Sequence, residues 1–118
     1  MGKLTTHVLD VSSGIPAAGV LIQLHAASAG PSAKPLVEVV IGSDGRCASP
    51  LLEGDGFRSG TYLLTFHIAD YFRSRGVVLP DPAFLEVAVI RVGIAAPEQH
   101  YHVPLLISPW SYSVYRGG

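Results

Sequence analysis

The chain has 118 residues, of which 48% are hydrophobic and 14% are charged, and its formal net charge is −1. This length suffices for one buried core, so we expect residues 1–118 to form a single domain. The near-neutral charge offers no basic stripe to nucleic acid, and no apolar run reaches the roughly 18 residues that cross a bilayer, so neither nucleic acid nor a membrane is an expected partner.

The first half of the chain predicts three strands and a tight turn. Strands are expected over residues 4–11, 20–27 and 35–41, where apolar residues recur with period two. Gly14 and Pro16 supply the bend between the first two. Asp44 and Gly45 tolerate positive φ and predict a hairpin turn, so Arg46 should begin the next strand, exposed at its rim.

The second half predicts four more strands and one short helix. Residues 60–69 alternate well and indicate a central strand. Asp70 is expected to cap a helix over residues 71–75, which Gly76 would end. Further strands are predicted over residues 84–92, 99–107 and 111–116. About eight strands in all indicate an all-β, antiparallel sandwich, whose chemistry must come from strand ends or from subunit interfaces.

The cysteine and histidine content favours chemistry without a metal. Cys47 is the only cysteine, which excludes an intrachain disulfide and a zinc site built from several cysteines. His100 and His102 should share one face of a strand and could bind zinc or copper if a third ligand approached. Glu98 lies before that strand in a predicted loop, and no other acidic residue flanks the pair. We therefore expect no metal.

Two blocks of the sequence resemble the 5-hydroxyisourate hydrolase branch of the transthyretin family. The first comprises residues 4–10 (LTTHVLD) with residues 14–20 (GIPAAGV), and the second is the closing stretch 100–118 (HYHVPLLISPWSYSVYRGG). Between them, Arg46 after Asp44-Gly45, Thr61-Tyr62 and residues 70–72 (DYF) follow the family's order. The resemblance thus spans nearly the whole chain.

The resemblance implies both an architecture and a reaction. The expected fold is a transthyretin-like sandwich of two four-stranded sheets with one short helix, assembled as a homotetramer with active sites at subunit interfaces. The expected reaction is the opening of 5-hydroxyisourate by water, without metal or organic cofactor, to 2-oxo-4-hydroxy-4-carboxy-5-ureidoimidazoline in urate degradation. The implied catalytic residues are His7, Arg46 and His102, and the implied substrate-binding residues are His7, Arg46, Tyr115, Arg116 and Gly117.

These residue types suit the implied chemistry. Opening a cyclic acyl–nitrogen bond needs a base for the attacking water, a donor for the oxyanion and a proton for the leaving nitrogen. Imidazole titrates near neutral pH, so His7 or His102 can be the base while the other holds or delivers a proton. Arg46 can grip a carbonyl or anionic edge through two parallel hydrogen bonds. The sequence leaves open which histidine is the base.

Two alternatives and one departure qualify this interpretation. The channel of such a sandwich could instead carry a small ligand without catalysis, or the domain could be an interaction module. The family's tail usually ends in a serine with a possible proton-relay role, whereas this chain has Gly118, so that role does not transfer. Residues 1–6 lack the pattern of a signal peptide, from which we expect a cytoplasmic protein.

Overall fold

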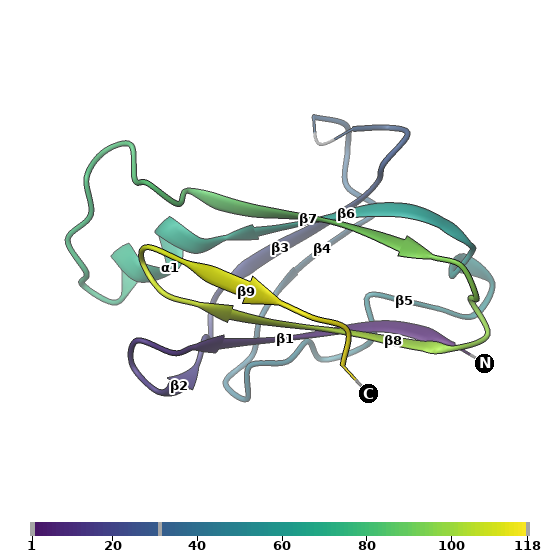
Figure 1. Cartoon of the computed structure of the whole chain (residues 1–118), viewed down its shortest axis with the longest axis horizontal. Coiled ribbons are helices and arrows are strands. Elements are labelled where there is room, and N and C mark those ends of the chain that lie inside the picture. The colour runs from purple at the N-terminus through teal and green to yellow at the C-terminus, as the bar shows by residue number, and fades with distance from the viewer. Residues whose placement is uncertain (1, 31, 118) are drawn as a thin grey trace.

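The computed structural model describes residues 2–30 and 32–117, which form two β-sheets packed face to face (Figure 1). The first sheet has the order β2-β1-β8-β9, with β5 also paired to β1, and the second has the order β4-β3-β6-β7. The strands of the first sheet are β1 (Lys3–Asp10), β2 (Ile15–Pro16), β5 (Leu52–Glu53), β8 (His100–Ile107) and β9 (Tyr112–Val114). Those of the second are β3 (Leu21–Ala26), β4 (Val37–Val40), β6 (Gly60–His67) and β7 (Val87–Ile94).

The all-β fold class is confirmed, and the differences concern short elements and strand direction. The first sheet has a fifth member because β2 and β5, of two residues each, pair with β1. The β1 and β8 strands run parallel, which corrects the expectation of a wholly antiparallel sandwich. Arg46 does not begin a strand but forms an isolated antiparallel bridge with His7.

The helix α1 (Ile68–Ser74) begins three residues before its predicted start. His67 occupies the N-cap position without a side-chain hydrogen bond, and Asp70 lies inside the first turn. The predicted capping role of Asp70 was therefore wrong. Four buried residues of the helix cover one end of the core, namely Ile68, Ala69, Tyr71 and Phe72. Burial of this apolar face, rather than capping, fixes where the helix begins. A 3₁₀ turn, η1 (Gly54–Gly56), is the other helical segment described.

Strand alternation decides which side chains leave the core. On β1, the inward residues Leu4, Thr6, Val8 and Asp10 are buried, whereas Thr5, His7 and Leu9 are half-buried on the outer face. On β8, residues 101, 103, 105 and 107 are buried, and His102 faces outward beside β1. The outer face of the first sheet therefore displays the histidines. No helix within residues 2–30 and 32–117 has the length and apolar character needed to cross a membrane.

Candidate active site

His7 and His102 lie on neighbouring strands of the outer face of the first sheet. Parallel pairing of β1 with β8 places Thr5 opposite His102 and His7 opposite Pro104. The two imidazole rings are inclined by 29°, and their centroids are 6.4 Å apart. Both rings can therefore act on one small group that lies between them.

Arg46 reaches the same face from the turn that follows β4. The amide of Val8 donates to the carbonyl of Gly45 at 2.9 Å, and the amide of Arg46 donates to the Asp44 carboxylate at 3.0 Å. Gly45 has φ +82°, and a Cβ there would lie 2.9 Å from the His7 ring. Only glycine suits both the left-handed conformation and this close approach. The turn thus sets Arg46 directly beside His7.

The segment after β9 closes the other side of His102. The amide of Gly117 donates to the His102 carbonyl at 2.8 Å. A Cβ on Gly117 would lie 2.7 Å from Cδ2 of the His102 imidazole and 3.2 Å from Cγ of Pro104. The lack of a side chain at this position therefore leaves room for the His102 ring.

These residues line a hollow of about 270 Å³ on the outer face. Its walls are formed by His7, Leu9, Arg46, His102, Pro104, Leu105, Leu106, Tyr115 and Gly117. Five of the six residues expected at the site are thus brought together. Arg116 is not among them: its guanidinium lies over the Tyr101 ring, 4.0 Å from the centroid, and donates to Gln99 and to the His100 carbonyl.

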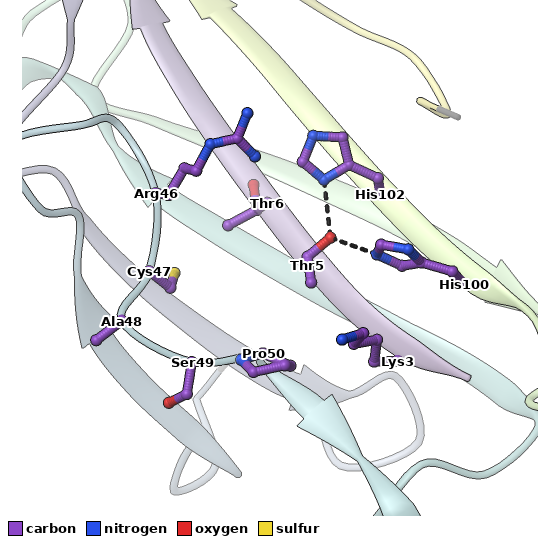
Figure 2. Close-up of a pocket in the computed structure, with 10 residues that line it drawn as sticks. All are labelled: Lys3, Thr5, Thr6, Arg46, Cys47, Ala48, Ser49, Pro50, His100 and His102. Atoms are coloured by element: carbon purple, nitrogen blue, oxygen red, sulfur yellow. Dashed lines mark hydrogen bonds between the residues drawn. The ribbon is translucent and has the colours of Figure 1, made fainter. Parts of the chain in front are cut away.

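A second hollow of about 400 Å³ adjoins the first through Arg46 and His102, which line both (Figure 2). Its walls are formed by Lys3, Thr5, Thr6, Arg46, Cys47, Ala48, Ser49, Pro50, His100 and His102. Figure 2 shows Thr5 between the two imidazoles of β8, with its hydroxyl 2.8 Å from Nδ1 of His102 and 2.9 Å from Nε2 of His100. No role at the site was predicted for Thr5 from the sequence. Its place two residues before His7, on the same strand face, was the available signal.

The surroundings lower the pKa of both site histidines. Burial is the largest cause for His7 and for His102, and the positive charge of Arg46 lowers each pKa further. The charges of His7 and His100 act in the same direction on His102, whereas a backbone hydrogen bond and the charge of Asp44 oppose the shift at His7. Both imidazoles are therefore predominantly neutral at pH 7 and able to accept a proton.

The remaining candidate groups do not form a second chemical centre. Nowhere in residues 2–30 and 32–117 do three His, Cys, Asp or Glu side chains gather as metal ligands, and His100 and His102 instead share the Thr5 hydroxyl. Cys47 is half-buried, and burial together with the charge of Asp44 raises the pKa of its thiol. A raised pKa disfavours the thiolate, which is the reactive form. Gly118 lies outside the described residues.

Comparison with known proteins shows which family and fold the chain resembles. The family model described as HIUase/Transthyretin family matches residues 4–117. A 5-hydroxyisourate hydrolase 2 from Rhizobium meliloti is 56% identical over 116 residues, which are 98% of this chain and 96% of that protein. A 5-hydroxyisourate hydrolase structure from Klebsiella pneumoniae superposes with a TM-score of 0.81 at 30% identity, covering 100% of both chains.

An (S)-allantoin synthase structure superposes with a TM-score of 0.91 at 44% identity. The match covers 99% of this chain but only 44% of that protein, so this chain spans less than half of its length.

Proposed function

This chain belongs to the HIUase/Transthyretin family, and we propose that it is a hydrolase that opens the ring of 5-hydroxyisourate in urate degradation. Relatives named for this activity match nearly the full length of the chain. The observation that carries the assignment is the convergence of two neutral imidazoles and one guanidinium on a single small hollow. These groups can supply the base, the proton donor and the oxyanion partner that a ring-opening hydrolysis requires.

The proposed reaction adds water to the acyl carbon of the ring. One imidazole takes a proton as the water oxygen attacks, and the carbon–nitrogen bond then breaks. The nitrogen receives a proton from an imidazole, and the new carboxylic acid ionises. Because the pKa values of His7 and His102 are both lowered, each starts as a neutral acceptor at pH 7.

Arg46 is the proposed partner of the oxyanion. Its guanidinium borders both hollows, so it can reach the substrate carbonyl without being buried. A planar guanidinium donates two parallel hydrogen bonds, which holds the ring in place as negative charge develops on oxygen. Tyr115 and Gly117 complete the wall that faces the substrate.

The test is the near-ultraviolet absorbance of freshly prepared 5-hydroxyisourate, followed with and without the protein. We expect the protein to accelerate decay well beyond the spontaneous rate. His102→Asn should reduce the rate by roughly 10² to 10⁴, the usual range for a general acid or base. If the protein binds the compound but leaves its decay unchanged, it is a carrier and not a hydrolase.

The proposal includes a homotetramer in the cytoplasm. Large apolar side chains are exposed on the chain, among them Leu36, Val78, Phe84, Trp110 and Tyr115. With only 14% charged residues, this is more apolar surface than a small monomer usually shows. Association that covers the outer face of the first sheet would also exclude water from the hollow beside His7 and His102, which strengthens the electrostatic contacts there.

The half-buried Cys47 is the only cysteine, and this suits a reducing compartment.

A further inference from the structure

We propose that Thr5 and His100 form a proton path that sets the tautomer of His102 and connects that imidazole to solvent. The consequence for catalysis rests on the proposed hydrolase function, whereas the hydrogen-bonded path itself does not. Neither Thr5 nor His100 was expected at the site from the sequence. The path assigns His102, rather than His7, as the base for the attacking water.

The geometry fixes the path within the first sheet. Parallel pairing places Thr5 opposite His102 and Lys3 opposite His100. The three side chains of the path, His102, Thr5 and His100, therefore stand together on the outer face. The Thr5 hydroxyl lies 2.8 Å from Nδ1 of His102 and 2.9 Å from Nε2 of His100. His102 is half-buried whereas His100 is exposed. The path therefore leads from the hollow to bulk water.

The Thr5 hydroxyl limits how the two neighbouring histidines are protonated. A hydroxyl has one proton to donate, so at least one of the two imidazoles must donate to Thr5; when the hydroxyl proton itself goes to a histidine, one imidazole donates to Thr5 and the other accepts from it. In the outward arrangement, Nδ1–H of His102 donates to Thr5 and Thr5 donates to His100. Nε2 of His102 is then free to accept a proton. In the inward arrangement every bond reverses, and Nε2 of His102 carries a proton.

Figure 2 shows where Nε2 of His102 points. Nδ1 faces Thr5, and Nε2 lies at the end of the ring away from Thr5, on the side of the ring where the Arg46 guanidinium stands. A water molecule or substrate nitrogen held near Arg46 would thus meet Nε2. The direction of the hydrogen bonds at Thr5 decides whether it meets an acceptor or a donor.

A proton taken up by His102 can leave without any other reactant. When Nε2 accepts a proton from water, Nδ1–H passes to the Thr5 oxygen as the Thr5 hydroxyl proton passes to Nε2 of His100. His102 returns to a neutral form that carries its proton on Nε2. His100 holds the extra proton and releases it from Nδ1 to solvent, which completes the switch from the outward to the inward arrangement. When Nε2–H of His102 is given to the leaving nitrogen, the Thr5 hydroxyl proton passes to Nδ1 of His102, Nε2–H of His100 passes to the Thr5 oxygen, and His100 takes up a proton from solvent at Nδ1, which restores the outward arrangement.

The charges around the path favour this outward transfer. The groups that face His102 are the Arg46 guanidinium from its turn, His7 from β1 and His100 from β8. Arg46 also lines the hollow beside Thr5, whereas Lys3 lies opposite His100 and acts against a positive charge there. Among the described residues that line this hollow, none has an acidic side chain. A positive charge on half-buried His102 is therefore opposed by Arg46, His7 and His100. The same charge on exposed His100 is stabilised by water.

The experiment compares Thr5→Val, Thr5→Ser and His100→Gln with the native protein. Valine keeps the shape of threonine without its hydroxyl, and serine keeps the hydroxyl. Thr61→Val is the matched control, since Thr61 is a half-buried threonine on β6 of the other sheet. Circular dichroism checks that each variant is folded, and exposed His100 gives a variant with little risk to folding.

We expect Thr5→Val to lose about tenfold or more in kcat, up to the roughly 10²- to 10⁴-fold contribution of a general acid or base, and Thr5→Ser to recover most of that loss. His100→Gln should lower kcat and shrink the solvent deuterium isotope effect, and Thr61→Val should do neither. Equal rates for Thr5→Val and Thr5→Ser would overturn the path in catalysis. An inactive native protein would instead overturn the proposed function.

Nitrogen NMR of the imidazoles provides a readout that does not depend on turnover. In the resting native protein we expect His102 to carry its proton on Nδ1, because the outward arrangement holds it there. Thr5→Val should shift the proton toward Nε2, and Thr5→Ser should not. An identical His102 tautomer in the native protein and in Thr5→Val would contradict the path even if the hydrolase activity is found.

Discussion

Arg46 contributes both a positive charge and a planar shape to the site, and substitution can separate the two. We expect Arg46→Lys to keep the pKa values of His7 and His102 low, because the charge remains, but to lose about 10² to 10³ in kcat/KM, because an ammonium cannot make the paired hydrogen bonds. The free energy of unfolding should change by less than about 0.5 kcal/mol, since Arg46 is exposed. Activity assays and urea denaturation measure both quantities.

Arg46→Gln removes the positive charge and tests how that charge sets the pH dependence of activity. The guanidinium lowers the pKa of His7 and of His102, so its removal should raise both. A base must be neutral to act, and activity is lost as pH falls through its pKa. The acidic limb of kcat/KM should therefore lie below the ordinary histidine value in the native protein and move to higher pH in Arg46→Gln. Proton NMR titration of both rings checks the direction, and unchanged values would show that Arg46 does not set them.

Gly117 is expected to act by leaving space rather than by touching substrate. A methyl group at Gly117 would lie 2.7 Å from Cδ2 of His102, so Gly117→Ala must push that imidazole away from its position. A displacement of about 1 Å at a reacting group can cost about 100-fold in rate. We expect a loss of this order with little change in stability. Gly56→Ala is the control, because a Cβ there meets nothing within 4 Å.

At the scale of single residues, the sequence motifs identified the groups that we propose to carry the chemistry, but not the groups that we propose to position them. His7, Arg46 and His102 were identified from motifs, and they do lie together. Thr5 was missed because threonine is common in strands, so its presence there does not by itself indicate a functional role. Arg116 belongs to the motif, yet it lies over Tyr101, outside the hollow of His7 and His102. Which way a side chain turns at the end of a sheet depends on tertiary contacts that a motif does not contain.

At the scale of elements, a buried hydrogen bond ties β1 to α1. The Tyr71 hydroxyl donates to the Asp10 carboxylate at 2.9 Å, and Asp10 is only 1% exposed. Burial raises the pKa of Tyr71 to about 12, and the bond to Asp10 contributes to this value. Burial alone would raise the pKa of Asp10, but hydrogen bonds from Ser12, Tyr71 and Ser13 hold it below its ordinary value. This contact fixes the end of β1 against the helix.

We expect Tyr71→Phe to destabilise the fold by about 1.5 to 3 kcal/mol at pH 7, as for other hydrogen bonds to charged groups. The lowered pKa of Asp10 means that its stabilisation is present above the unfolded-state pKa and is lost as pH falls through the folded-state value. The difference between native and variant should therefore shrink in strong acid. Urea denaturation from pH 7 downward measures it.

Tyr62→Phe provides the comparison, since the Tyr62 hydroxyl donates to the uncharged carbonyl of Arg58. We expect a loss of about 1 kcal/mol for this variant, the usual value for a neutral hydrogen bond. The loss in the free energy of unfolding of Tyr62→Phe should stay constant over the same pH range. If the loss in the free energy of unfolding of Tyr71→Phe is also independent of pH, the Tyr71 hydrogen bond does not contribute to the lowered pKa of Asp10.

Alternation of apolar residues predicted the boundaries of the long strands β1 and β8, but not those of β7 or of the short elements. β1 and β8 were each placed to within one residue at both ends. The start of α1 was misplaced because the apolar run that leads into it alternates like the preceding strand β6. β7 begins at Val87 rather than Phe84, and Phe84 is exposed beside Trp110. Two-residue strands such as β2 and β5 carry no period to detect.

At the scale of the whole molecule, we expect light scattering to give a mass close to four chains of 12.5 kDa each. The reason is the exposed apolar surface, which association would bury. Dilution should lower the activity per chain at the concentration where the mass falls, because the hollow beside His102 then opens to water. Full activity in a sample that scatters as a single chain would refute the tetramer as the active form.

The overall class of the molecule followed from the sequence, whereas its strand directions did not. Alternation of buried and exposed residues is the same in parallel and antiparallel strands, so period two cannot distinguish them. The parallel partnership of β1 and β8 joins segments that are far apart in sequence. Such pairing is decided by how the whole core packs, which no local pattern records.

That partnership also bears on how the protein acquires activity during synthesis. The Thr5 and His102 side chains that meet across it are separated by 97 positions, and Gly117 must then fold back onto His102. Contacts of such long range form late and slow folding, because a long loop must close before they contribute. A nascent chain that ends before β8 would hold His7 and Arg46 without their partner. The proposed catalytic face therefore matures only when residues 100–117 have been translated and paired, and we expect products that end before residue 100 to be inactive.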